Sequence, residues 1–147
     1  MELVHFIPPG SRQLVLMAAQ ADSAPVLIVG SNGTGKSAIA RWIHQHSIRM
    51  TRPFLTAGHH ESLSQQIRAA QGGTLLIPEL GEWPLGEQKT LLEFLNSRSV
   101  GAQDSDIRMI LNVRIIVTSS QGLEGRAQGG LLNAELLEKL NVFRIEM

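Results

Sequence analysis

The sequence predicts an α/β fold: a three-layer sandwich in which helices cover both faces of a mostly parallel central sheet. Short apolar runs, typical of buried strands, occur at residues 26–29, 53–57, 74–77, 113–118 and 142–146. Segments with apolar residues three and four positions apart, which predict helices, separate these runs. Because strands that alternate with helices pair in parallel through right-handed crossovers, a single sheet between two helical layers follows.

Two segments illustrate why helices are expected between the strands. Ser62 and Gln65 resemble a capping box, because a serine hydroxyl and a glutamine side chain can satisfy free amides of a first turn. Residues 85–98 place one face of a helix at Gln88, Leu91, Leu92 and Leu95. The same reasoning predicts helices over 11–20 and 36–46, and a leucine stripe predicts another over 132–140.

The composition is that of one globular domain without a broad charge bias. The 147 residues include 13 Lys plus Arg and 13 Asp plus Glu, so the formal charge is zero. A neutral chain has no general attraction to nucleic acid or to anionic membranes, and neither is predicted as a partner. Cysteine is absent, which excludes disulfides and thiolate chemistry. The apolar runs are too short to span a bilayer and no signal peptide is recognisable, so a cytoplasmic location is expected.

A glycine-rich loop between the first strand and the next helix predicts a phosphate-binding site. The stretch GSNGTGKS fits the pattern Gly, four residues, Gly-Lys-Ser/Thr, and comprises Gly30, Ser31, Asn32, Gly33, Thr34, Gly35, Lys36 and Ser37. Glycines let several N–H groups face one anion, and the helix start adds the positive end of its dipole. Lys36 is expected to reach the outer phosphates of ATP or ADP, and Ser37 to ligate Mg²⁺. A chance match in a glycine-rich turn is the competing interpretation.

The strand at residues 74–77 ends in an unusual pair for a nucleotide site. In proteins with such a loop, a later apolar strand usually ends in an aspartate that helps to hold Mg²⁺. Here Pro78 takes that place and Glu79 follows it. Proline has no side-chain oxygen, so the binding of Mg²⁺ is left open.

Several long segments resemble the bacterial sigma-54-dependent transcriptional activators, the enhancer-binding class of AAA+ ATPases. The stretch VLIVGSNGTGKSAIARWIHQHSIRMTRPF is similar to that family's nucleotide-binding segment, and GGTLLIPELGEWPLGEQKTLLEFL to its second acidic motif and following helix. The stretches VRIIVTSS and LLEKLNVFRIE are similar to its later strands. The resemblance implies the AAA+ form of the P-loop NTPase fold, ATP binding, and a role in transcription regulation.

The resemblance also implies catalytic roles for several positions, and only some of these positions keep the family's residue. Glu79 would be the general base that orients a water, and Ser120 stands where the family has an asparagine that senses the γ-phosphate. Gly58 replaces the asparagine that toggles the catalytic glutamate. Asn133 and Lys139 fall near the arginines that reach into a neighbouring subunit. The substitutions all lead us to expect an ATPase that is weak at most.

The parts of the family that contact other proteins are missing from the sequence. Residues 54–72 hold one short predicted helix where the family inserts two loops, one of them carrying the GAFTGA motif that touches sigma-54. The chain ends at Met147, before the helical lid that closes over the adenine in the family. One AAA+ domain over residues 1–147, without the lid, is therefore expected.

Three functions remain open at this point. The favoured one is a regulatory module that binds ATP or ADP, hydrolyses poorly, and signals by occupancy or by capping a ring of related AAA+ subunits. The second is an active Mg²⁺-dependent ATPase that uses substituted catalytic groups. The third is a structural or interaction domain that no longer binds nucleotide. The expected partners are the nucleotide and either related AAA+ subunits or a transcription-regulatory protein.

Other notable side chains are interpreted as structural. His44 and His46 lie two positions apart on a helix and so face different directions, which makes a shared metal ion improbable. Trp83 is expected to be a packing residue. Arg108 and Arg114 flank the fourth strand and are expected to be solvated.

Overall fold

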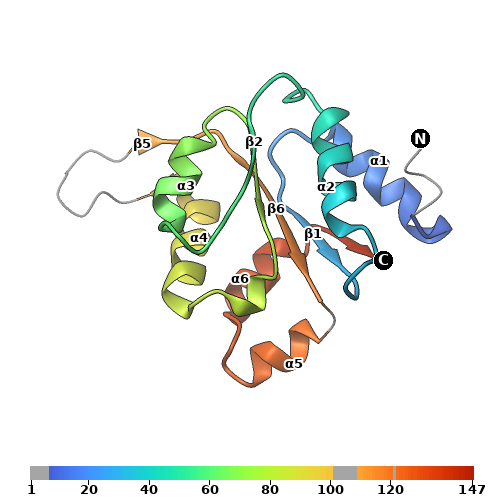
Figure 1. Cartoon of the computed structure of the whole chain (residues 1–147). Helices are drawn as coiled ribbons and strands as arrows, with labels where there is room; N and C mark the ends of the chain where they lie inside the picture. The colour runs from blue at the N-terminus through green and yellow to red at the C-terminus, as the bar shows by residue number, and fades with distance from the viewer. Residues whose placement is uncertain (1–6, 101–108, 121) are drawn as a thin grey trace.

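The computed structural model describes residues 7–100, 109–120 and 122–147 and confirms the predicted α/β sandwich. Five parallel strands form the central sheet in the order β2-β3-β6-β1-β7 (Figure 1). Their bounds are β1 (Val26–Val29), β2 (Phe54–Thr56), β3 (Thr74–Ile77), β6 (Arg114–Ser119) and β7 (Phe143–Glu146). The middle strands β1, β3 and β6 are buried at every position, as expected for the apolar runs at residues 26–29, 75–77 and 115–117, and burial extends to the polar residues at the ends of β3 and β6.

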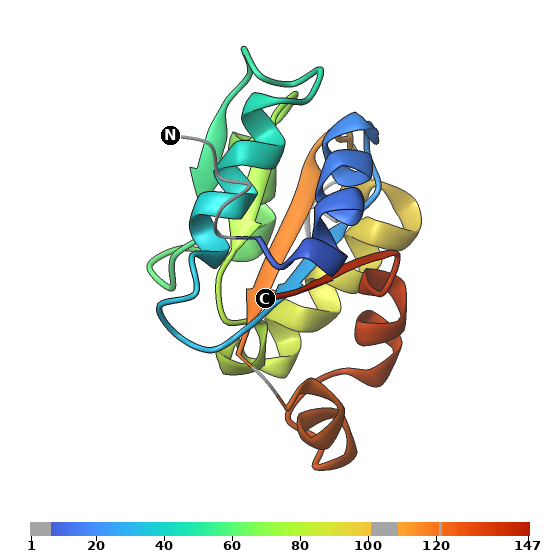
Figure 2. The ribbon, with the colours of Figure 1, turned by 90° about the vertical axis from the view of Figure 1, so that its right-hand side faces the viewer.

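Helices cover both faces of this sheet. The first face carries η2 (Pro9–Ser11), α1 (Arg12–Gln20) and α2 (Lys36–Gln45), and α1 and α2 lie in front of the sheet in Figure 2. The second face carries α3 (Leu63–Ala69), η3 (Leu80–Glu82), α4 (Leu85–Ser97), α5 (Leu123–Gln128) and α6 (Ala134–Leu140). Each layer buries its own apolar cluster against the sheet, so the core has two halves. Within the described residues, no helix is long and apolar enough to cross a membrane.

The sequence did not predict the two short 3-10 helices, η2 and η3, nor two short strands and helix α5. Strands β4 (Ser99–Val100) and β5 (Met109–Ile110) form a small antiparallel pair outside the main sheet. Two residues are too few to show the alternation that reveals a strand. Helix α5 has polar residues and an internal glycine, and so carries no apolar stripe.

The predicted start of α3 is confirmed at its capping residue, and α6 has a cap that was not predicted. The Ser62 hydroxyl accepts a hydrogen bond from the Gln65 amide at 3.3 Å, as expected for the start of α3. The Gln65 side chain bonds to the Ser62 hydroxyl rather than to its amide, so only half of the capping box forms. Asn133 caps α6 in the same way, because its side-chain oxygen accepts from the Leu136 amide at 3.0 Å.

The prediction that Arg114 is solvated was wrong. Its side chain is fully buried at the amino end of β6, and its Nε donates to the Ala24 carbonyl at 3.2 Å. Within the described part of the chain, neither terminal nitrogen of Arg114 has a hydrogen-bond partner. Burial, together with the charge of Arg49, lowers the pKa of Arg114 to about 10. The segment that holds Arg108 lies outside the described residues.

Arg49 organises the loops at this amino edge of the sheet. Its guanidinium donates to the carbonyl oxygens of Asp22, Gly72, Gly73 and Asn112, and to the Asn112 side chain at 2.6 Å.

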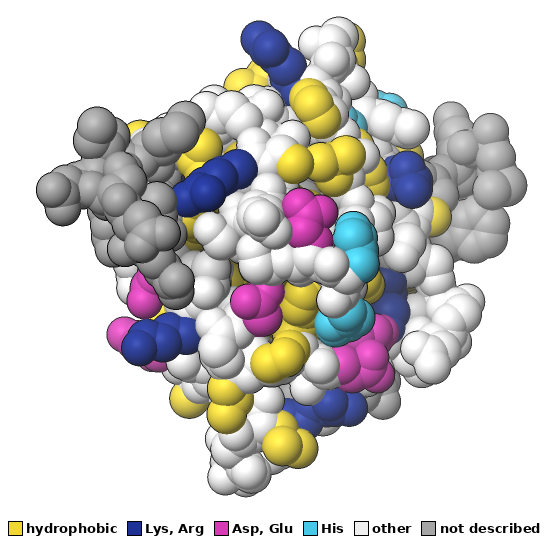
Figure 3. All heavy atoms as spheres, turned by 60° about the vertical axis from the view of Figure 1, so that its left-hand side comes forward, with side chains coloured by type: hydrophobic (Ala, Val, Ile, Leu, Met, Phe, Trp, Pro, Cys, Tyr) yellow, Lys and Arg dark blue, Asp and Glu magenta, His cyan; other side chains and the backbone are white. Residues whose placement is uncertain are grey.

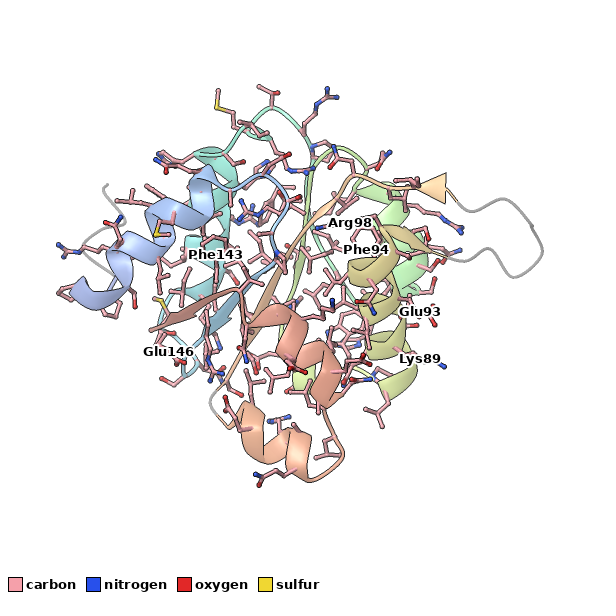
Figure 4. The ribbon with its side chains drawn as sticks, turned by 180° about the vertical axis from the view of Figure 1, so that it is seen from behind. Lys89, Glu93, Phe94, Arg98, Phe143 and Glu146 are labelled. Carbon is pink, nitrogen blue, oxygen red and sulfur yellow. The ribbon has the colours of Figure 1, made fainter. Side chains whose placement is uncertain are left out.

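A second arginine, Arg98, lies at the same edge. It donates to the Ser23 and Val113 carbonyls and covers the Phe94 ring (Figure 4). The loops before β1, β3 and β6 are thus held together by arginine bonds to backbone oxygens.

The two buried arginines should differ sharply in what they contribute to stability. Arg114→Met is expected to leave the free energy of unfolding unchanged or to raise it, because an apolar side chain of similar length removes an incompletely bonded charge. Arg49→Met is expected to cost about 3 kcal/mol, because it removes the hydrogen bonds that join three loops and takes away the side-chain donor of the Asp22 and Gly72 carbonyls. Urea denaturation of both variants measures this. A loss above about 2 kcal/mol in Arg114→Met would contradict the assignment, since it would mean that the guanidinium is well paired.

Buried His44 makes stability depend on pH. Its Nδ1 lies 2.8 Å from the Thr74 hydroxyl, and its Nε2 lies 3.1 Å from the Arg52 carbonyl. Because a carbonyl only accepts, the neutral ring donates from Nε2 and accepts at Nδ1. Burial lowers the pKa of His44 below 6.5, and the nearby charges of Arg49 and Arg114 lower it further.

Acidification should therefore destabilise the fold through His44. The unfolded chain takes up a proton near pH 6.5, whereas folded His44 resists protonation until its lowered pKa is reached. This contribution to stability is complete above pH 6.5 and is lost as the pH falls from there through the lowered pKa. Unfolding titrations at several pH values should give a shallower pH dependence for His44→Gln than for the wild type. His46→Gln alters an exposed ring and should retain the wild-type dependence.

Candidate functional site

The loop at residues 30–35 leaves the carboxyl end of β1 and leads directly into α2. Gly33 and Gly35 have φ angles of 85° and 87°, the left-handed region that glycine tolerates best. The Thr34 hydroxyl donates to the Ser31 carbonyl at 2.7 Å and closes the turn. No side chain caps the start of α2. The first amides of this helix are therefore available to an anion at the end of the helix dipole.

Gly30 is needed where the loop begins. Its amide donates to the Ser119 carbonyl at 3.0 Å, which fixes the loop to β6. A Cβ atom at residue 30 would lie 2.7 Å from the Cβ of Met147 and 2.9 Å from the Thr34 hydroxyl. Met147 is held there because its amide donates to the Val29 carbonyl at 2.8 Å.

Lys36 folds back over the loop from the first turn of α2. Its side chain is 9% exposed, and its Nζ donates to the Gly30 carbonyl at 2.7 Å. It also donates to Glu79 Oε1 at 3.0 Å. Lys36 and Glu79 were both predicted to belong to the nucleotide site, and in the structure they form a direct ion pair.

Glu79 is held by hydrogen bonds with Lys36 of α2 and with residues at and just after the end of β6. Its Oε2 accepts from the Ser120 amide at 3.1 Å, and its own amide donates to the Thr118 hydroxyl at 3.3 Å. Burial raises the pKa of Glu79, but the bonds from Lys36 and the Ser120 amide outweigh this effect and lower the pKa below its usual value. The carboxylate is therefore ionised near neutral pH.

Two of these contacts could not be predicted from the motifs. Ser120, which stands at the family's sensor position, bonds to Glu79 through its backbone amide. Thr118 was not singled out at all. Its position on β6 beside β3 would have identified it only if the strand order had been known.

Pro78 and Trp83 complete the wall of the site behind Glu79. The Pro78 carbonyl accepts from the Trp83 indole Nε1 at 2.9 Å. The Trp83 side chain is buried, in agreement with its predicted packing role. The His59 ring lies against it with the ring centres 4.1 Å apart.

A hollow of about 360 Å³ lies on the outer side of Trp83, bordered by His59, Pro84 and Glu87. On the face shown in Figure 3, histidine and acidic side chains lie close together beside exposed apolar ones. The Glu87 carboxylate is already used at this position, because it accepts from the Leu63 amide at the start of α3 at 2.6 Å.

The chain offers few ligands for a metal ion. Ser37 is exposed at the start of α2, where its hydroxyl could ligate Mg²⁺. Both Glu79 oxygens already accept hydrogen bonds, and Pro78 offers no side-chain ligand. The described residues contain no group of three or more His, Cys, Asp or Glu side chains placed to hold a metal. Any Mg²⁺ would therefore depend mainly on phosphate oxygens and water for its remaining ligands.

The remaining residues of catalytic interest lie apart from Lys36. Gly58 is held by the Gln66 side chain, which bonds to its amide at 2.9 Å and its carbonyl at 2.8 Å. Asn133 is the helix cap of α6, and Lys139 is exposed further along that helix. Among the described contacts, none joins these three residues to Lys36 or Glu79.

The parallel sheet, with a glycine-rich loop between β1 and α2, defines the P-loop NTPase fold. Residues 12–147 match the family model described as the sigma-54 interaction domain, and the chain belongs to this family.

Curated relatives agree with this assignment. The chain is 32% identical over 162 residues to the response regulator protein FleR of Pseudomonas aeruginosa, covering 93% of this chain and 34% of FleR. It is 31% identical over 148 residues to the DNA-binding transcriptional regulator NtrC of Escherichia coli, covering 85% and 32%. The chain thus spans about a third of the length of these relatives.

Solved structures share the fold. NtrX from Brucella abortus in complex with ADP superposes with a TM-score of 0.81 at 26% identity, over 93% of this chain and 34% of NtrX. The same protein in complex with ATP gives a TM-score of 0.81 at 27% identity, over 93% and 36%. The P-loop NTPase domain of a sigma-54 activator from E. coli gives 0.69 at 23% identity, over 92% and 89%, and this similarity supports the fold alone.

The crowding at Gly30 gives a direct test of the loop geometry. Gly30→Ala is expected to lower the free energy of unfolding by about 1–3 kcal/mol, because the new methyl group overlaps Met147 and Thr34. Gly86→Ala is the matched control, since a methyl group there meets nothing within 4 Å and favours helix α4. Equal stability changes in the two variants, measured by urea denaturation, would contradict the described contact with Met147.

Proposed function

We propose that this domain is a nucleotide-binding regulatory module of the sigma-54 activator family, which binds ATP or ADP at residues 30–37 and hydrolyses ATP slowly at most. The observation that carries the proposal is the buried Lys36 amine, 2.7 Å from the Gly30 carbonyl inside an open glycine loop at a helix start. Such a loop with its lysine is a phosphate-binding arrangement. The related NtrX structures in complex with ADP and ATP support the same ligand class.

Binding would use only groups of this chain that are already in place. The amides of the first turn of α2, which no side chain caps, would donate to phosphate oxygens together with amides of the loop. Lys36 would turn from Glu79 toward the outer phosphates, a movement of one side chain. Mg²⁺, when bound with nucleotide, neutralises phosphate charge, and Ser37 is the residue placed to hold it.

Slow hydrolysis is inferred from the substituted groups. Pro78 supplies no metal ligand, and Gly58 has no side chain to act on Glu79. Lys139 lacks the planar fork with which an arginine binds a phosphoryl transition state, and Asn133 carries no charge. Loss of such an arginine typically slows turnover by about 10³ or more.

The output of the module would then be nucleotide occupancy rather than mechanical work. β2 is joined to β3 through α3 alone, so no long loop projects between them to touch sigma-54. Occupancy signals through a partner that distinguishes the bound from the free loop. The partner class that fits is a related AAA+ subunit, as in capping of a ring, or another transcription-regulatory protein.

An active ATPase is the second candidate, and the position of Glu79 favours it. The carboxylate is ionised and lies beside the phosphate loop, where it could orient an attacking water as a general base. A domain that has lost nucleotide binding and serves only as an interaction module is the third.

Calorimetric titration with ATP and with ADP, with and without Mg²⁺, separates the three candidates. We expect a dissociation constant on the order of micromolar, weak dependence on Mg²⁺, and turnover no faster than background. Lys36→Ala should abolish binding because it removes the phosphate-facing charge. Lys89→Ala, which alters a lysine extending outward from α4 (Figure 4), should bind like the wild type.

The other outcomes have distinct meanings. Turnover above background that disappears in Glu79→Gln would establish the ATPase instead. Absence of binding at high protein concentration would leave the interaction module.

A further inference from the structure

We infer that Trp83 is a positioning residue for the proposed nucleotide site. It holds Glu79 where the carboxylate forms an ion pair with Lys36, and so it limits the affinity for nucleotide. The inference rests on the proposed function, because it concerns how tightly the loop at residues 30–37 binds phosphate. It assigns a role to a tryptophan that the sequence indicates only as packing.

Trp83 is held by a hydrogen bond from its indole N–H, by ring contact on one face, and by backbone hydrogen bonds. Its Nε1 donates to the Pro78 carbonyl at 2.9 Å, and the side chain is only 3% exposed. Its backbone amide donates to the Leu80 carbonyl at 3.1 Å, and its carbonyl accepts from Gln88 Nε2 at 2.8 Å. The His59 ring covers its outer side, at 4.1 Å between ring centres. The indole N–H therefore has one fixed target, the carbonyl of the residue before Glu79.

Glu79 needs this support because its backbone is unusual. Its φ angle of 51° and ψ angle of 65° lie in the left-handed region, which residues with side chains rarely adopt. Pro78 has no N–H of its own, so its carbonyl is its only polar backbone group. With that carbonyl bonded to Trp83 and the Glu79 amide bonded to Thr118, the peptide between the two residues is held at both of its polar atoms.

The consequence is a competition for Lys36. In the free loop, Lys36 Nζ is shared between the Gly30 carbonyl and Glu79 Oε1. Outer phosphate oxygens therefore compete with the Glu79 carboxylate for the charge and the donors of this amine. Glu79 thus acts as an internal anion, and any change that loosens residues 78–79 should favour the nucleotide.

A double-mutant cycle tests this coupling. Trp83→Phe keeps an aromatic ring but removes the N–H, and Glu79→Gln removes the competing charge. We expect the ADP dissociation constant, measured calorimetrically without Mg²⁺, to fall about threefold in Trp83→Phe and about tenfold in Glu79→Gln. In the Glu79→Gln background, Trp83→Phe should change the constant by less than about twofold, because its effect acts through Glu79. Trp42→Phe, on α2, is the matched control. It should leave the ADP dissociation constant unchanged both in the wild type and in the Glu79→Gln background.

A merely structural role for Trp83 would give a different result. An unchanged or weakened affinity in Trp83→Phe, or the same factor in both backgrounds, would overturn the inference. Melting temperatures of all variants establish that each is folded at the temperature of the titration.

A second readout does not depend on nucleotide. The Glu79 carboxylate can be titrated by carbon NMR in the wild type, Trp83→Phe and Trp42→Phe. The pKa of Glu79, lowered in part by Lys36, should rise toward its usual value in Trp83→Phe alone. If the wild type binds no ADP but the pKa of Glu79 still rises in Trp83→Phe, the proposed function is refuted and the positioning role is retained. No rise would refute the positioning role.

Discussion

The ion pair between Lys36 and Glu79 depends on the arrangement of the whole sheet. These residues are 43 positions apart, yet Nζ and Oε1 lie 3.0 Å from each other. They meet because β1 and β3 both pair in parallel with β6, which brings the carboxyl ends of all three strands to one edge. Thr118 and Ser120 at the end of β6 then bond to Glu79 from the strand between them. A site of this kind needs no ligand to assemble, since its charged groups satisfy one another.

The opposite edge of the sheet is built for rigidity instead. Arg49 binds the carbonyl oxygens of the loops before β1, β3 and β6, so the amino ends of these strands have little freedom to separate. Arg114 adds a second buried charge there, and its terminal nitrogens have no hydrogen-bond partner among the residues that the structure describes. The positive charges of Arg49 and Arg114 also explain why neutral His44 is favoured at this edge. Movement of the domain is therefore expected at the loop edge, where the contacts are side-chain bonds that a ligand can replace.

Local patterns in the sequence were sufficient to predict the fold class and to locate the glycine-rich loop. Unbroken apolar runs identified the buried strands, and glycines followed by Lys36 identified the loop, because each signal lies within a few residues. The contacts of Glu79 could not be read in this way, since they come from strands whose order the sequence does not state. Arg114 was placed wrongly for a related reason: a charged residue beside a strand is usually solvated, and only the neighbouring loops bury it here.

Pro78, which offers no side-chain ligand to a metal ion, also contributes to how Glu79 is held. With an aspartate at position 78, a side-chain oxygen would be directed at the metal and the backbone would keep its N–H. Pro78 has neither group, and what remains is a carbonyl that binds Trp83. Lys36 would leave Glu79 only when a phosphate group competes with the carboxylate for its amine. Such a competition suits the proposed module, whose output would depend on nucleotide occupancy more than on turnover.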